Sequence, residues 1–117
     1  MGDRFLKMPD SIMLPTQEGI HIVQTVDIIR CETFGSYTTF HLINEKKIIL
    51  SKSLSSFKDV LFAPFFLRVH HSHLVNFSKI VLYQRKGFLN MADGAVVPVS
   101  RSKKVIIRHL LESKPEV

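Results

Sequence analysis

Three histidines lie close together in residues 66–76 (FLRVHHSHLVN). Up to His70 the apolar and polar residues alternate as in a half-buried strand, but continuing the alternation would turn both His71 and His73 inward. We therefore expect the strand to stop near His70 and the chain to turn at residues 71–72, which leaves His71 exposed. An imidazole donates and accepts hydrogen bonds and is cationic when protonated, so His71 is a candidate contact to phosphate or base edges. His70 is expected to be structural and to hold the turn.

A second polar stretch, residues 97–104 (VPVSRSKK), runs from a strand into a helix predicted over 102–112. Lys103 and Lys104 would lie in the first turn of that helix, where the macrodipole makes additional cations unfavourable. A bound phosphate would relieve this repulsion and accept from the free backbone N–H groups. Arg101, just before the helix, has a planar fork that suits bidentate contact with guanine. The alternative interpretation of these three cations is a solvated basic face.

A third candidate is the turn predicted after residues 28–33. Gly35 permits a tight turn there. Ser36, Tyr37 and Thr38 present hydroxyl groups of the kind that bind phosphate or sugar. Because such residues are common in hairpins, this turn is a weaker candidate than the other two.

The charge of the chain is unevenly distributed. Residues 1–45 hold three Lys and Arg against six acids, a net of −3, whereas residues 46–117 hold thirteen against four, a net of +9. Such segregation is typical of nucleic-acid-binding proteins, although a basic surface without a partner would give the same count. The chain has no apolar run long enough to span a bilayer and no signal-peptide pattern. Its single cysteine, Cys31, forms no internal disulfide, so the composition predicts a cytoplasmic protein without a membrane partner.

The length predicts one domain, over residues 11–112. Residues 1–10 are interpreted as a linker or an artificial start, and residues 113–117 as a C-terminal tail. The fold is expected to be mostly β, with Pro98 in an edge strand because proline lacks a backbone donor. The predicted strands are residues 12–14, 20–24, 28–33, 37–43, 47–51, 66–70, 81–84, 88–91 and 96–99.

Two short helices are expected beside these strands. Ser53 is the predicted N-cap of the first, in which Leu54, Phe57 and Leu61 recur at helical spacing before Pro64 ends it. The second, over residues 102–112, carries one apolar stripe, formed by Ile106, Ile107, Leu110 and Leu111.

The three polar stretches together resemble the signature blocks of the LytTR family. Residues 28–38 (IIRCETFGSYT), 66–76 and 97–104 occur in the family's order with similar spacing, and the similarity extends over residues 11–111. The most specific part is the RVH-x-S-x-LVN block followed by PVSR. LytTR domains are DNA-binding output modules of bacterial transcription regulators, commonly fused behind a phospho-accepting receiver domain.

The resemblance implies an elongated β-β-β sandwich of short antiparallel strands with short helices. In this family, loops at one edge contact double-stranded DNA, two in successive major grooves and one over the intervening minor groove. By motif position the major-groove contacts fall at or near Tyr37 and at Arg101, and the intervening contact falls at His71. His71, Ser36 and Ser102 stand where the family more often has Arg, Asn and a basic residue, so two loops carry less permanent charge than is usual.

These features predict a sequence-specific DNA-binding domain of a two-component transcription regulator, with no enzymatic activity, cofactor or metal. Its partners are expected to be double-stranded DNA, as repeated sites bound by two copies, and a receiver domain N-terminal to this chain. Three alternatives carry less weight. A metal site would use His71 and His73 with His70 or His41, but no cysteine pair or suitably spaced carboxylate supports it. A hydrolase lacks paired carboxylates, and a protein-interaction module would have lost its DNA contacts.

Overall fold

Short strands in three antiparallel sheets form the framework of the computed structural model, which describes residues 7–117. The sheets have the strand orders β1-β2, β5-β4-β3-β7-β6 and β10-β9-β8. The expected mostly-β sandwich of short antiparallel strands is therefore confirmed. The strands are β1 (Ser11–Thr16), β2 (Gly19–Gln24), β3 (Ile28–Phe34), β4 (Tyr37–Leu42), β5 (Lys47–Leu50), β6 (Phe66–His70), β7 (His73–Asn76), β8 (Ile80–Gln84), β9 (Phe88–Met91) and β10 (Val96–Pro98).

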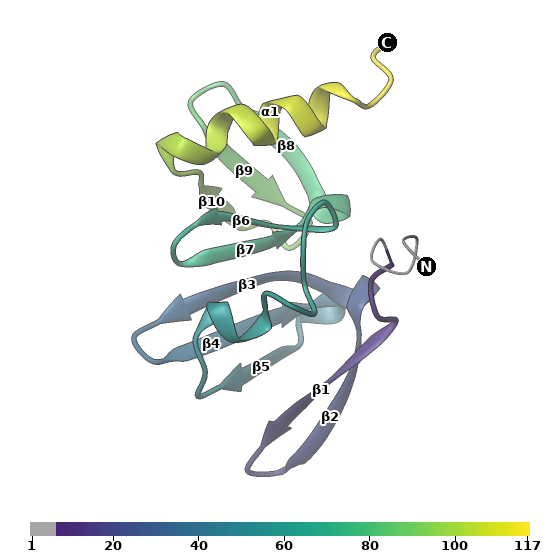
Figure 1. Ribbon diagram of the computed structural model, residues 1–117, viewed down its shortest axis with the longest axis vertical. Coiled ribbons are helices and arrows are strands. Elements are labelled where there is room, and N and C mark those ends of the chain that lie inside the picture. The colour runs from purple at the N-terminus through teal and green to yellow at the C-terminus, as the bar shows by residue number, and fades with distance from the viewer. Residues whose placement is uncertain (1–6) are drawn as a thin grey trace.

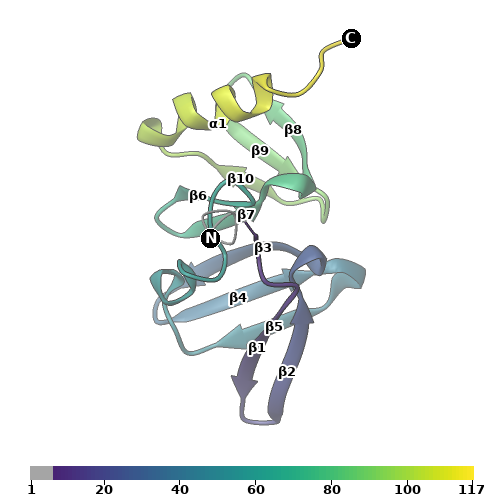
Figure 2. The ribbon, with the colours of Figure 1, turned by 45° about the vertical axis from the view of Figure 1, so that its right-hand side comes forward.

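The three sheets follow one another along the long direction of the molecule (Figure 1). The β1-β2 hairpin lies at one end and the five-stranded sheet in the middle. The three-stranded sheet lies at the other end, together with the helix α1 (Lys104–Glu112). The turned view in Figure 2 shows the same order. Pro98 lies in β10, an edge strand of its sheet, as its missing N–H predicts.

The five-stranded sheet separates two hydrophobic cores, because successive side chains of a strand point to opposite faces. On one face Cys31 and Leu74 pack with β1, β2 and the 3₁₀ helix η4 (Leu54–Phe57). On the other face Val75 packs with residues of the three-stranded sheet and with Ile107 of α1. Adjacent residues of β7 thus enter different cores, which explains why this short strand is almost wholly buried.

The prediction of a first helix after Ser53 is only partly right. The segment forms the single 3₁₀ turn η4, and the Ser53 side chain makes no capping bond to the backbone. One turn is enough to direct Leu54 and Phe57 into the core, where Leu61 joins them. The helical spacing in the sequence therefore marked buried positions correctly but overstated the length of the helix.

The second helix begins later than predicted. Residues 101–103 form the 3₁₀ helix η6 (Arg101–Lys103), and α1 starts at Lys104 rather than at Ser102. The tight turn arises because the Lys103 N–H donates to the Ser100 carbonyl three residues earlier (2.9 Å). Ile107 is fully buried, whereas Ile106 is half exposed and lies outside the buried stripe.

Three further 3₁₀ turns connect the strands: η2 (Thr25–Asp27), η3 (Ile43–Glu45) and η5 (Phe77–Lys79). Between β9 and β10 the chain makes a loop over residues 92–95. The Met91 N–H donates to the Ala95 carbonyl, and the Gly94 N–H donates back to Met91, each over 2.9 Å. Among residues 7–117, no helix has the length and hydropathy needed to cross a membrane.

Candidate nucleic-acid interface

Two backbone hydrogen bonds hold three turns side by side. The Thr33 N–H donates to the Ser72 carbonyl (2.9 Å), which joins the β3-β4 turn to the β6-β7 turn. The Ser100 N–H donates to the Val69 carbonyl (2.8 Å), which joins the segment before η6 to the end of β6. We call residues 34–37, 70–73 and 100–103 the three-turn edge; in Figure 1 it lies on the left of the molecule.

The β6-β7 turn has the form expected from the sequence. The strand ends at His70, and the His70 Nδ1 accepts from the Ser72 N–H (3.1 Å), so His70 holds the turn as predicted. The Arg68 guanidinium donates to the His71 carbonyl from the strand behind. His71 itself is exposed, with its ring centre 4.4 Å from that of His70. An exposed imidazole on a braced turn is available to a ligand.

Arg101 and Lys103 are exposed on the first turn of the C-terminal helical segment. Neither η6 nor α1 has a side-chain cap or an acidic residue in its first turn. The positive end of the segment is therefore not neutralised from within, which is the condition under which an anion binds well. Ser100 fixes the position of Arg101, because its N–H and its hydroxyl both donate to the Val69 carbonyl.

Lys104 differs from the other two cations of this stretch. It is half-buried, and its side chain lies over the β8-β9 turn at Gly87. A Cβ atom added to Gly87 would stand 2.5 Å from Cε and 2.6 Å from Nζ of Lys104. Its ammonium group therefore lies beside the turn that carries Arg85 and Lys86, so the cationic surface continues past the three-turn edge.

The β3-β4 turn presents two of its three predicted contact residues. Ser36 is exposed, and Tyr37 keeps 54% of its surface accessible. The expectation for Thr38 is wrong: its side chain is fully buried and its hydroxyl donates to the Lys52 carbonyl. Thr38 faces inward because it follows Tyr37 in a strand, where consecutive side chains point to opposite faces.

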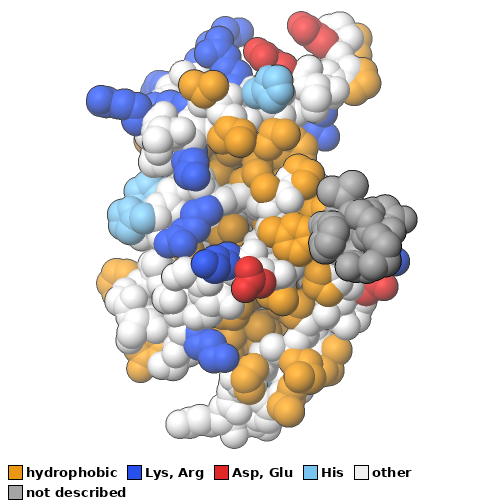
Figure 3. All heavy atoms as spheres, viewed as in Figure 1, with side chains coloured by type: hydrophobic (Ala, Val, Ile, Leu, Met, Phe, Trp, Pro, Cys, Tyr) orange, Lys and Arg blue, Asp and Glu red, His pale blue; other side chains and the backbone are white. Residues whose placement is uncertain are grey.

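The surface of the three-turn edge combines cationic and apolar groups. Residues 34–37, 70–73 and 100–103 include no Asp or Glu. In Figure 3, Lys and Arg side chains gather near the start of α1, histidines lie over the β6-β7 turn, and hydrophobic side chains lie over the β3-β4 turn. Cations on neighbouring turns can bind the phosphates of a polyanion, and the hydrogen-bonding groups beside them can contact base edges.

Behind the edge, an ion-pair network links two sheets. Arg30 on β3 pairs through Nε with the Asp93 carboxylate (2.8 Å) and through Nη1 with Glu32 (3.3 Å), and Glu32 also pairs with His41 (2.7 Å). Burial would raise the pKa of Asp93, but the hydrogen bond from the Ala95 N–H and the Arg30 charge lower it overall. Burial would likewise raise the pKa of Glu32, but His41 and Arg30 lower it overall. Sequence reasoning missed this network, because Arg30 and Asp93 are 63 residues apart.

His73 is half-buried below the exposed turn. Its Nδ1 is buried and has no hydrogen-bond partner among the described residues. The pKa of His73 is lowered overall, chiefly by burial. The charge of Glu32 opposes this shift, and the charges of Arg30, His70 and His71 add to it. Within residues 7–117, no three His, Cys, Asp or Glu side chains are grouped so that they could hold a metal ion. The predicted metal alternative therefore has no geometric support in the part of the chain that the structure describes.

Phe34 is the residue of the edge that sequence reasoning passed over. It begins the β3-β4 turn opposite Tyr37, and 88% of its surface is exposed. The sequence places Phe34 in the turn predicted after residues 28–33, but only the hydroxyl residues of that turn were considered as contacts, and in the structure Phe34 is the last residue of β3. Only the exposure in the folded chain distinguishes Phe34 from the buried phenylalanines.

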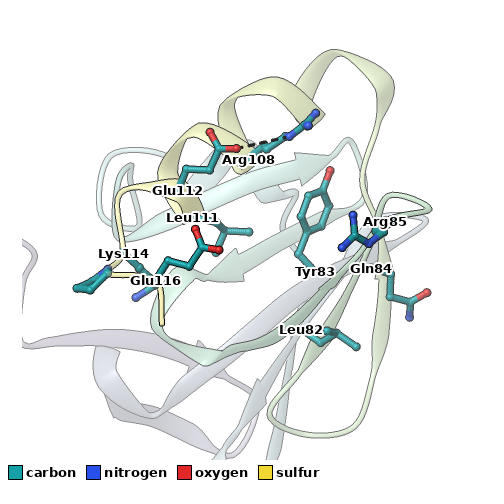
Figure 4. A pocket seen from close by; sticks show the side chains of 10 residues that line it. Leu82, Tyr83, Gln84, Arg85, Arg108, Leu111, Glu112, Lys114 and Glu116 are labelled. Atoms are coloured by element: carbon teal, nitrogen blue, oxygen red, sulfur yellow. Dashed lines mark ion pairs between the residues drawn. The ribbon is translucent and has the colours of Figure 1, made fainter.

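A groove away from this edge lies between β8 and the C-terminal segment (Figure 4). Tyr83, Arg85 and Leu111 line it, and Arg108 pairs there with Glu112 over 3.7 Å. Both members of that pair are largely exposed, so the pair adds little to stability. The groove is open and lined by both cationic and acidic side chains, so it is a weaker candidate for binding a polyanion than the three-turn edge.

The chain is similar to known proteins over most of its length. The family model described as the LytTr DNA-binding domain matches residues 18–112, a range that contains all three turns. A solved structure, the LytTr DNA-binding domain of a response regulator from Bacillus cereus, is similar to this chain with a TM-score of 0.74 and 27% identity. The similarity covers 88% of this chain and 97% of that one. No curated protein matches the chain.

Proposed function

The chain belongs to the LytTr DNA-binding domain family, and from this premise we propose that it reads double-stranded DNA sequence-specifically through the three-turn edge. The observation that carries the proposal is the pair of backbone bonds, Thr33 to Ser72 and Ser100 to Val69, which set the three turns in one row. Because both bonds join backbone atoms, the spacing of the turns does not depend on side-chain rotamers. A row of defined spacing suits a duplex, whose grooves are regularly spaced.

Within this row we assign different roles to the exposed side chains. Arg101 enters one major groove, where its guanidinium group contacts guanine. Tyr37 and Ser36 enter the next major groove. His71 lies over the minor groove between them. Lys103 contacts phosphate, and Lys104, beside the β8-β9 turn, adds to the attraction of the backbone. Thr38 has no part in this assignment.

In a cell the domain would act as the output part of a bacterial two-component regulator in the cytoplasm. A receiver domain N-terminal to this chain would control it, and two copies would occupy repeated sites. Footprinting of a selected operator tests the second point, since two protected half-sites are expected. A single protected half-site at saturation would contradict it.

The decisive experiment is selection of bound duplexes from a random pool, followed by fluorescence anisotropy. Affinity should fall steeply with salt, because each phosphate contact contributes about 0.9 to the slope of log K against log salt. Arg101→Ala should lose about 1 to 3 kcal/mol on the selected site and relax the preference at one base pair. Arg108→Ala, an exposed arginine further along α1, is the matched control and should bind nearly as the wild type does.

Two results would count against the proposal. Absence of binding to any duplex at low salt would refute DNA binding itself. An equal loss on all sequences for Arg101→Ala would leave DNA binding intact but make Arg101 a phosphate contact. In the first case the apolar outer face of the β1-β2 hairpin, where Met13 and Ile22 stand opposite each other and are exposed, would favour the protein-interaction alternative.

A further inference from the structure

Phe34 exposes almost its whole ring to solvent at the tip of the β3-β4 turn. Its exposed fraction is 88%, whereas Phe40, Phe57 and Phe66 are buried in the core. An exposed aromatic ring forgoes the favourable burial that the other phenylalanines obtain on folding. A fully exposed ring within a polar, cationic edge is therefore more useful to a ligand than to the fold.

The tip that carries Phe34 is held rigidly. The Thr33 N–H donates to the Ser72 carbonyl (2.9 Å), and the Thr33 hydroxyl donates to the Tyr37 carbonyl (3.0 Å), which closes the turn. Gly35 has φ +62°, and a Cβ atom added to it would meet nothing within 4 Å. The space beside Gly35 at the tip is therefore open, while the backbone behind it is hydrogen-bonded to the β6-β7 turn and to Tyr37.

Phe34 also stands next to the other contact residues of the edge. It lines the same hollow as His71 and Ser72, and it pairs across the hairpin with Tyr37. Hydrophobic side chains and histidines accordingly adjoin at this side of the molecule in Figure 3. Phe34 therefore lies between two of the side chains proposed to contact DNA, within reach of the same ligand.

We propose that Phe34 is a specificity-determining residue that contacts the C5 methyl group of a thymine in the major groove entered by the β3-β4 turn. The inference rests on the proposed function. A phenyl ring forms no ordinary hydrogen bond with a base edge, and the thymine methyl is the apolar group that the major groove displays. The domain thus selects thymine at one position by apolar contact, in addition to the bases read by hydrogen bonds.

The test uses the selected duplex with each thymine replaced in turn by uracil, which lacks only the C5 methyl group. For the wild type, one replacement should weaken binding about fourfold, the effect of removing one buried methyl group, and the others should have little effect. Phe34→Ala should bind the thymine duplex about tenfold more weakly and lose the sensitivity to that replacement. Phe34→Leu should keep part of both effects.

Val26→Ala is the matched control. Val26 is an apolar residue with 69% of its surface exposed, and it precedes the opposite end of β3, so its removal should change neither affinity nor the response to uracil. Because Phe34 is exposed, Phe34→Ala should fold as the wild type does, which its unfolding curve verifies.

Two results would overturn the inference. The first is a Phe34→Ala variant that binds as the wild type does or that keeps the uracil sensitivity. The second is an equal loss on thymine and uracil duplexes with reduced DNA bending, which would make Phe34 a wedge between base pairs. If the wild type bound no duplex, the proposed function would fail instead, so the two failures are distinguishable.

Discussion

Replacing Asn76 by alanine should destabilise the domain by about 2 to 4 kcal/mol, because the buried amide satisfies two elements at once. Its Nδ2 donates to the Ile28 carbonyl at the start of β3 (2.8 Å). Its Oδ1 accepts from the Ser78 N–H (3.0 Å) and from the Ser78 hydroxyl (2.9 Å), which caps η5. Ile28 is fully buried, so water cannot replace the lost donor there.

The estimate follows from counting the groups that lose a partner. Each buried polar group left unsatisfied costs about 1 to 3 kcal/mol. The Ile28 carbonyl incurs that cost in full. Ser78 is exposed and can bond to water, so the loss of the Asn76 cap on η5 adds only about 1 kcal/mol. Asn76→Asp keeps the acceptor but sets a carboxylate oxygen against the Ile28 carbonyl. At neutral pH it should therefore be at least as destabilising as alanine, despite its matching shape.

Urea unfolding followed by far-ultraviolet circular dichroism measures both variants. For Asn76→Ala the midpoint should fall by about 1 to 2 M with an unchanged m-value, since m depends on the surface exposed on unfolding. Asn90→Ala is the control: Asn90 is half-buried and accepts from Gln84, so its loss should cost under about 1 kcal/mol. A loss below about 0.5 kcal/mol for Asn76→Ala, or a fully tolerated Asn76→Asp, would refute the reasoning.

Two further predictions concern pH and the β8-β9 turn. Burial lowers the pKa of both His41 and His73 below the ordinary 6.5, so the unfolded chain binds more protons and the free energy of unfolding should decrease from pH 7.5 to 5.5. His73→Gln should reduce that slope in urea titrations at each pH, and an unchanged slope would contradict the assignment. Gly87→Ala should cost about 1 to 2 kcal/mol in thermal unfolding, because φ is +96° there. The double variant Gly87→Ala/Lys104→Ala should recover little of this loss, since the end of the Lys104 side chain can move away from the new Cβ atom. A full recovery would mean that the contact with Lys104, and not the backbone conformation, causes the loss.

The β6-β7 turn shows what local pattern predicts well. Alternation up to His70 and the cost of burying imidazoles were enough to predict the turn at residues 71–72, the exposure of His71 and the structural role of His70. The argument did not hold for His73, which is half-buried with a buried Nδ1. The edge position of Pro98 was predictable for a similar reason, because a missing N–H constrains a strand wherever the strand lies. Both predictions depend on interactions within a few residues of the chain.

The β3-β4 turn shows where such reasoning stops. Ser36, Tyr37 and Thr38 look alike as hydroxyl residues, but a one-residue difference along a strand reverses the face, and only Thr38 is buried. Phe34 has no hydroxyl group and was not considered as a contact, and its almost complete exposure is known only from the folded chain. The orientation of each depends on the register of the hairpin within the five-stranded sheet, which the local pattern does not contain.

The sequence by itself determined the family, the mostly-β fold and the three stretches proposed to contact DNA, because these follow from motif order, alternation and turn residues close together in the chain. The family resemblance also implied that the three turns share one edge. Only the tertiary structure decided which backbone hydrogen bonds join these turns, that Lys104 lies over Gly87, and that Arg30 pairs with Asp93 across two sheets. The physical reason is that these arrangements depend on long-range hydrogen bonds and ion pairs. Such contacts form between segments that only the packing of two cores against one sheet brings together.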